Sequence, residues 1–165
     1  MIEHLIQHPV RSLVGFIKAA ATFHLVQTHF FQISGADGPS MLPTFTVEGD
    51  ILALDMTARY GRRISIGDLV LYKIPISPCD IGVKRVVGMP GDYVLIGNPG
   101  DERDNGSMIQ VPKGHCWLVG DNLAFSRDSR YFGPVPLALI QGKVMAKILP
   151  WSERQWIGSG LEPVN

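Results

Sequence analysis

Ser40 is the serine in this 165-residue sequence that is best placed to act as a nucleophile. It lies in the stretch Ser34–Thr44, with Gly38 and Pro39 before it and Pro43 after it. Glycine and proline mark turns, and proline also restricts the backbone of the residue before it. The hydroxyl is therefore held on a stiff, non-helical segment, as a catalytic serine needs. The same pattern is typical of an ordinary turn serine, so the assignment depends on a base that can take the hydroxyl proton.

Lys84 is the strongest candidate for that base. Histidine is the usual base, but His115 is the one histidine beyond the N-terminal segment, and no acidic motif accompanies it. The other four are His4, His8, His24 and His29. Lys84 lies in the apolar run Ile81–Gly88, where a period of two puts it on one strand face with Gly82 and Val86. Burial there lowers a lysine pKa from its usual value of about 10.4, whereas the alternative is a strand lysine whose amine reaches solvent.

The composition indicates a single domain with many short strands. The chain is 45% hydrophobic and 18% charged, with 18 glycines and 12 prolines, which favours strands and turns over long helices. Acidic and basic residues are equal in number, so nothing indicates a nucleic acid partner. Cys79 and Cys116 lack the spacing of a zinc site and are expected to be buried or free thiols. We expect no metal and no cofactor.

Residues 1–33 are expected to form a membrane-anchoring helix. The segment Val10–Phe31 is mostly apolar and long enough to span, as a helix, a hydrocarbon core of about 30 Å. Polar side chains interrupt it at Lys18, His24, Gln27 and His29. A transmembrane helix is the favoured interpretation. An amphipathic helix lying on a membrane or on a partner protein, and a cleaved targeting segment, are the alternatives.

Short apolar runs separated by turns predict a β-rich domain over residues 34–150. We expect strands at 51–54, 69–72, 82–87, 93–96, 115–119 and 143–149. Residues 97–110 are polar and rich in turn formers and are predicted to be a surface loop, and residues 136–142 are predicted to form one or two helical turns. The tail, residues 151–165, is expected to be peripheral. The predicted fold class is mainly β, behind one N-terminal helix.

Four blocks of the sequence, in this order, resemble the successive boxes of type I signal peptidases. They are Ser40–Thr44, Gly67–Val70, Lys84–Asp92, and Gly120–Asn122 followed by Ser126–Gly133. The resemblance runs from residue 34 to residue 150. It implies a β-rich catalytic domain at a membrane surface that cleaves targeting presequences. It also implies that Ser40 is the nucleophile and Lys84 the general base of a Ser/Lys dyad.

The same resemblance implies supporting roles for five further residues. Ser126 is expected to orient the amine of the base through a hydrogen bond. Asp128 and Arg130 are expected to form a structural ion pair that braces their loop, and Asp121 to pair with Arg85. The alternative for each charged residue is a solvated surface position that contributes little to stability.

One position departs from part of the family. Some members carry a serine two residues before the nucleophile and use its hydroxyl in the oxyanion hole. Here that position is Gly38, and the following Pro39 has no N–H. The backbone N–H of Ser40 is the one oxyanion donor that the sequence identifies, and the second donor stays open.

The runs His115–Leu123 and Gly133–Pro136 resemble, within this family, the mitochondrial inner membrane peptidases of subunit 1 type. That resemblance implies a membrane-bound serine endopeptidase in the inner membrane, in contact with lipid, whose catalytic domain faces the intermembrane space. Its substrates are precursor proteins with sorting presequences, and it works in a heterodimeric complex with a second, related peptidase subunit. A self-cleaving repressor-type protease is a rival, but the apolar N-terminal segment resembles neither a DNA-binding domain nor a cleavable linker. An inactive, membrane-tethered binding subunit is another, against which the presence of both Ser40 and Lys84 argues.

Overall fold

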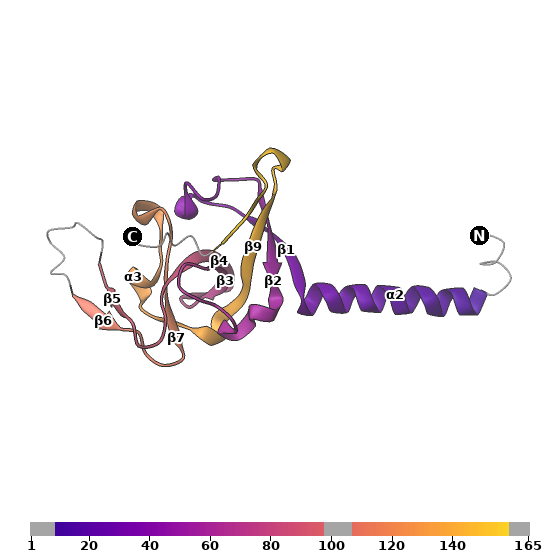
Figure 1. The fold of residues 1–165 in the computed structure, drawn as a ribbon, viewed down its shortest axis with the longest axis horizontal. Helices are drawn as coiled ribbons and strands as arrows, with labels where there is room; N and C mark the ends of the chain where they lie inside the picture. The colour runs from indigo at the N-terminus through magenta and orange to yellow at the C-terminus, as the bar shows by residue number, and fades with distance from the viewer. Residues whose placement is uncertain (1–8, 98–106, 159–165) are drawn as a thin grey trace.

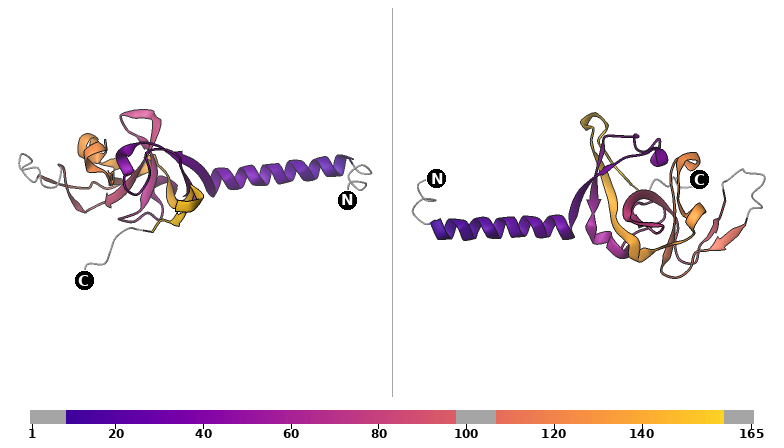
Figure 2. Two further views of the ribbon diagram at one scale, coloured as in Figure 1. Left: turned by 90° about the horizontal axis from the view of Figure 1, so that it is seen from above. Right: turned by 180° about the vertical axis from the view of Figure 1, so that it is seen from behind.

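The N-terminal helix extends away from the rest of the molecule (Figure 1). The computed structural model describes residues 9–97 and 107–158. Helix α2 (Pro9–His29) leaves most of its apolar side chains exposed, and two further views show the same straight extension (Figure 2). Among the helices of these residues, none combines the length and the hydrophobicity that crossing a membrane requires, so the predicted transmembrane span is not confirmed.

Antiparallel strands build most of the remaining domain. In the described residues the main sheet has eight strands in the order β1–β2–β9–β3–β4–β7–β8, with β10 paired to β9. Their bounds are β1 Phe31–Ala36, β2 Asp50–Asp55, β3 Leu69–Ile74, β4 Ser77–Gly88, β7 His115–Val119, β8 Val135–Pro136, β9 Ile140–Leu149 and β10 Gln155–Trp156. A separate two-stranded sheet joins β5 (Tyr93–Leu95) to β6 (Met108–Gln110). The prediction of a mainly β domain behind an N-terminal helix is confirmed.

Short helical turns connect the strands. They are η1 Pro39–Met41, η2 Met56–Gly61, η3 Leu123–Phe125, α3 Ser129–Phe132, η4 Leu137–Leu139 and η5 Trp151–Glu153. Helical turns this short are not stable on their own, because one turn forms too few hydrogen bonds to offset the cost of fixing its backbone. α3 is instead held by the side chain of Asp128, which accepts a hydrogen bond from the backbone N–H of Arg130 at its first turn.

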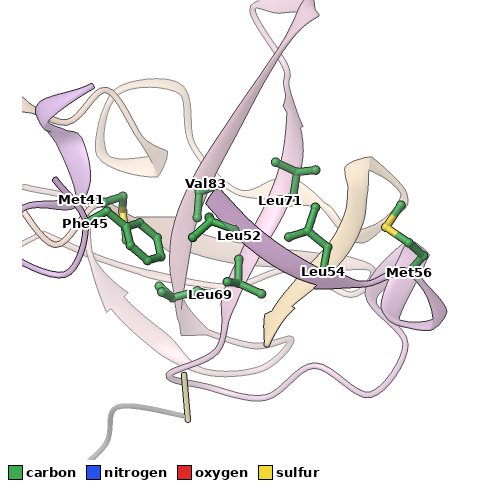
Figure 3. Close-up of a cluster of buried hydrophobic side chains, with 9 residues drawn as sticks. Met41, Phe45, Leu52, Leu54, Met56, Leu69, Leu71 and Val83 are labelled. Carbon is green, nitrogen blue, oxygen red and sulfur yellow. The ribbon is translucent and has the colours of Figure 1, made fainter. Parts of the chain in front are cut away.

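The buried core lies on both faces of the central strands. Along β3, alternate side chains pack into two different clusters, which explains why the run 69–72 is continuously apolar instead of alternating. Figure 3 shows the first cluster, in which side chains of β2, β3 and β4 meet those of Met41 and Phe45. Because Met41 and Phe45 are 3% and 2% exposed, the turn that carries Ser40 is anchored in the core.

Strand β1 is the main element that the sequence analysis did not predict. The apolar N-terminal run was expected to continue as helix to Phe31, but the helix ends at His29 and β1 begins at Phe31. Phe31 and Ile33 alternate with Gln32 and Ser34 along β1, which is the period of a strand. This alternation could not be recognised in the sequence because it follows the apolar helical segment without a turn-forming residue between them. The expected boundary between residues 33 and 34 consequently falls inside β1.

Two further predictions are corrected nearer the C-terminus. Residues 108–110, placed in the predicted loop 97–110, form β6, and residues 98–106 of that loop lie outside the described residues. The predicted helical turns at 136–142 shorten to η4, and Ile140 already begins β9. Gly142 lies within β9 and does not end a helix. Glycine is needed there because a Cβ would lie 3.1 Å from the carbonyl oxygen of Asp55.

The described part of the tail is attached to the sheet. β10 pairs with β9, and Glu153 of η5 accepts a hydrogen bond from Lys147 of β9 at 2.8 Å. Trp151 and Trp156 are nevertheless 70% and 83% exposed. This part of the tail therefore exposes its two tryptophans while hydrogen bonds hold it to β9.

Candidate active site

Ser40 lies at the centre of η1, half-buried at the surface of the domain. The preceding Gly38 has a φ of 106°, in the left-handed region that side chains disfavour, so glycine lets the chain enter the turn. Asn122 holds the turn from another part of the chain. Its backbone N–H donates to the carbonyl of Ser40 at 3.0 Å, and its side-chain amide donates to the carbonyl of Pro39 at 3.1 Å. The nucleophile candidate is thus fixed through its own backbone.

Lys84 is a buried lysine on β4 whose amine reaches this serine. Its Nζ lies 2.7 Å from Ser40 Oγ and donates to the carbonyl of Val83 at 3.0 Å, and the residue is only 6% exposed. Burial lowers the pKa of Lys84, and the carboxylates of Asp128 and Asp121 oppose that shift without cancelling it. The amine therefore lies beside the serine rather than in solvent.

Ser126 is buried beside the same turn, but the hydrogen bond expected between it and Lys84 is not formed. Among the described residues its Oγ has no hydrogen-bond partner, although only 3% of the residue is exposed. Ser126 packs against Gly120, where a Cβ would collide with the serine side chain and come within 2.5 Å of the carbonyl oxygen of Ser40. Glycine at position 120 is what lets these backbones approach.

Asp128 and Arg130 form the ion pair that was expected at the start of α3. Arg130 Nε donates to Asp128 Oδ1 at 2.8 Å and Nη2 donates to Oδ2 at 2.9 Å, and the two side chains are 5% and 0% exposed. Burial by itself raises the pKa of Asp128, but hydrogen bonds from Arg130 and Gly120, with the charge of Arg130, lower it overall. The ionised carboxylate joins α3 to the end of β7, because the Gly120 N–H also binds it at 3.0 Å.

Asp121 ties β4 to the nucleophile turn. Arg85 Nε and Nη2 donate to its two oxygens at 2.8 and 2.7 Å, which is the expected pairing. The hydroxyl of Thr44 donates to the same carboxylate at 2.5 Å. Sequence reasoning gave no role to Thr44 or to Asn122. Both stand inside the blocks that resemble the signal peptidase boxes, and that position was the signal that could have found them.

The alternative base, His115, lies at the other end of β7 from this site. It begins the strand opposite Pro136, and its Nδ1 lies 3.0 Å from the carbonyl of Lys113. Cys79 is exposed and Cys116 is buried, both as free thiols. Burial raises the pKa of the Cys116 thiol to about 12, which keeps it protonated and unreactive at neutral pH.

Two unpaired strand edges flank Ser40. β1 is the last strand of the sheet and, in the described part of the chain, pairs with β2 alone. On β4, residues 81–84 pair with β3 on one side and have no partner on the other within the described residues, because β7 joins only from Arg85 onward. A pocket of about 70 Å³ lies here, lined by residues of both strands and by Ser40. The arrangement suits nucleophilic attack on a carbonyl of an extended chain.

Comparisons with known proteins agree with this chemistry. A family model described as "Signal peptidase, peptidase S26" matches residues 10–100 and 98–149. The mitochondrial inner membrane protease subunit 1 of Schizosaccharomyces pombe is 36% identical over 92% of this chain and 94% of its own length. The protein of that name from Mus musculus is 44% identical over 70% of this chain and 68% of its own. The Schizosaccharomyces pombe subunit 2 is 33% identical over 86% and 78%.

Proposed function

This chain belongs to the signal peptidase family, peptidase S26, and is a serine peptidase, and we propose that Ser40 and Lys84 form its catalytic dyad. The observation that carries the proposal is the 2.7 Å contact between Ser40 Oγ and Lys84 Nζ. The amine in that contact is buried, and burial lowers its pKa. A neutral amine can accept the serine proton, whereas an ammonium cannot.

Acylation begins when the Ser40 hydroxyl gives its proton to the Lys84 amine. Ser40 Oγ forms a bond to the carbonyl carbon of the substrate, and the carbonyl electron pair moves to oxygen. The backbone N–H of Ser40 supports this oxyanion. When the intermediate collapses, the C–N bond breaks and the Lys84 ammonium returns its proton to the leaving amine. The products are an ester on Ser40 and the released C-terminal fragment.

Deacylation uses the same base on a water molecule. Water loses a proton to Lys84 while its oxygen attacks the ester carbon, and collapse returns Ser40 Oγ as the leaving group, which takes the proton back. Gly38, which stands where some family members have a serine, offers no second oxyanion donor. It has no side chain, and its N–H already binds the carbonyl of Val47 at 2.7 Å.

The substrate that suits this site is an extended peptide with a small residue before the cleaved bond. The free edges of β1 and of residues 81–84 on β4 can each pair with one side of such a peptide, which holds its backbone without reading its sequence. The pocket beside Ser40, at about 70 Å³, matches a small side chain in size.

The names of the relatives support a mitochondrial protease of signal-peptidase type that belongs to a multi-subunit complex with a related peptidase. We extend this to a catalytic domain that faces the intermembrane space and removes sorting presequences from precursor proteins delivered there. The exposed apolar side chains of α2 are the surface with which the enzyme contacts the inner membrane.

The test is cleavage of a precursor with an intermembrane-space sorting signal by the purified full chain, with and without the related second subunit. Wild type is compared with Ser40→Ala and Lys84→Ala, and a Lys113→Ala variant serves as the control for loss of a lysine elsewhere. We expect both dyad variants to be inactive while they keep the wild-type circular dichroism spectrum.

An active Lys84→Ala variant would remove Lys84 as the base, and His115 would then be tested. Cleavage that continues in Ser40→Ala would remove the nucleophile and with it the dyad. A folded wild type that cleaves nothing even with its partner would point instead to a binding subunit.

A further inference from the structure

Tyr72 is a fully buried tyrosine on β3 whose hydroxyl has no hydrogen-bond partner among the described residues. Its ring packs in the cluster that contains Val70, Val86 and Leu118. A buried hydroxyl without a partner lowers stability, because the group has lost its hydrogen bonds to water. Phenylalanine fills the same space without that loss. The hydroxyl therefore calls for an explanation other than packing.

The ladder between β3 and β4 puts Tyr72 beside the proposed base. Tyr72 lies opposite Gly82, and Val70 lies opposite Lys84. Alternate residues of a strand face the same side, so Tyr72 is a diagonal neighbour of Lys84 on one face of the sheet. A Cβ on Gly82 would lie 3.3 Å from Cε1 of the Tyr72 ring. Glycine at position 82 thus leaves the ring room to lie over β4 on the lysine side.

One buried carboxylate acts on both side chains. Burial is the largest cause that raises the pKa of Tyr72, and Asp128 and then Cys116 raise it further, so the hydroxyl keeps its proton. Burial also lowers the pKa of Lys84, against the opposing charges of Asp128 and Asp121. The tyrosine hydroxyl and the lysine amine therefore share the surroundings of Asp128.

Lys84 needs an additional acceptor once it has taken a proton. An ammonium has three N–H donors, and within residues 9–97 and 107–158 the acceptors at hydrogen-bond distance from Nζ are Ser40 Oγ and the carbonyl of Val83. Two buried hydroxyls of this region, those of Tyr72 and Ser126, have no hydrogen-bond partner among the residues that the structure describes. The resemblance to signal peptidases assigns Ser126 to the lysine and says nothing of Tyr72.

We propose that Tyr72 is a positioning residue for Lys84: its ring closes the buried side of the amine, and its hydroxyl dipole stabilises the ammonium form during catalysis. The inference rests on the proposed role of Lys84 as the base. It gives the hydroxyl a function in the reaction that offsets its cost to folding.

The experiment compares wild type with Tyr72→Phe, and uses Tyr60→Phe, at a 61% exposed tyrosine, as the matched control. The titration of Lys84 is followed by the ¹³Cε chemical shift of labelled lysine in the full chain, with the signal assigned from its loss in Lys84→Ala. We expect Tyr72→Phe to shift this titration to lower pH, because the ammonium has lost a stabilising dipole. We expect kcat for presequence cleavage to fall about tenfold at unchanged KM, with equal or higher thermal stability.

An unchanged Lys84 titration in Tyr72→Phe overturns the proposal, even if kcat falls, because a purely structural role predicts that result. The titration needs no substrate, so it tests the inference separately from the dyad, which the Ser40→Ala and Lys84→Ala assay tests. Should Tyr72→Phe fail to fold, Gly82→Ala replaces it, since the added Cβ displaces the ring and keeps the hydroxyl. A Lys84 titration that stays the same in Gly82→Ala likewise overturns the proposal.

Discussion

Replacing Asp128 by asparagine tests both the stability of the domain and the electrostatics of the proposed base. The substitution keeps the size of the side chain and removes its charge. Arg130, whose side chain is 5% exposed, then stays buried without its counter-charge. Removing one partner of a buried ion pair costs about 3–5 kcal/mol. Because domains of this kind are stable by about 5–15 kcal/mol, we expect a folded but strongly weakened variant.

The pH dependence of this loss has a definite sign. The folded protein lowers the pKa of Asp128, so its contribution to stability is fully present above the unfolded-state value of about 3.9. The contribution disappears as the pH falls through the folded-state value. The difference in unfolding free energy between wild type and Asp128→Asn is therefore largest near neutral pH and shrinks in acid.

The same substitution acts on catalysis through Lys84. The charge of Asp128 opposes the effect of burial on the pKa of Lys84. Without that charge the pKa of Lys84 falls further. The acidic limb of kcat/KM, which reports the pKa of the base in the free enzyme, should then move to lower pH in Asp128→Asn.

Urea unfolding at neutral pH and at pH 3, together with the pH–rate profile, measures both effects. Arg63→Ala is the control. Arg63 and Asp55 form a solvent-accessible pair at 3.7 Å, with side chains 69% and 26% exposed, for which we expect a loss below about 1 kcal/mol. The reasoning is refuted if Asp128→Asn costs no more than Arg63→Ala, or if the acidic limb moves to higher pH.

Three further predictions concern the site itself. In wild type, kcat/KM should rise with pH as Lys84 loses its proton, with a midpoint below the usual lysine pKa of about 10.4; a pH–rate profile without that limb would contradict it. Gly120→Ala should lose about 1–3 kcal/mol or more in urea unfolding, because its Cβ would meet Ser126 and the carbonyl oxygen of Ser40, and wild-type stability would show that the crowding is absent. Asn122→Ala removes only the side-chain hydrogen bond to the carbonyl of Pro39. We therefore expect kcat to fall about tenfold while the unfolding free energy changes by no more than about 1 kcal/mol; an unchanged kcat would count against this role.

The sequence predicts which residues make up the site better than it predicts the contacts among them. Local backbone restriction and the apolar surroundings of the strand made Ser40 and Lys84 candidates, and the resemblance to signal peptidases assigned them as the dyad. The structure brings the two side chains together. The ion pairs of Asp121 and Asp128 with their arginines are also formed. Ser126 is near its expected place, but a hydrogen bond depends on rotamers that no sequence pattern specifies. In the part of the chain that the structure describes, its hydroxyl has no hydrogen-bond partner.

Most strands of the fold could be predicted, and the elements that were missed share a physical cause. β1 follows directly after α2, so its alternating pattern merged with an apolar run of helical length. β6 has three residues and, within the described residues, forms its ladder with β5 alone, and three residues are too few for periodicity to be recognised. Gly142 was interpreted as the end of a helix. Its actual role is to let the backbone of β9 lie close to that of Asp55, and the local sequence cannot show this because Asp55 is far away in the chain.

The segment Gly120–Asn122 determines how far the proposed nucleophile stands from its base. Asp121 binds Arg85, the neighbour of Lys84 on β4, and Asn122 binds the carbonyl of Ser40. The turn and the strand are thus each hydrogen-bonded to the same three residues, and Met41 of the turn and Val83 of β4 also pack in the same core cluster. A displacement of that segment changes the distance between Oγ and Nζ directly, and proton transfer depends steeply on that distance. Substitutions there should therefore lower kcat while leaving KM unchanged, because none of the three residues belongs to the strand edges proposed to hold the peptide.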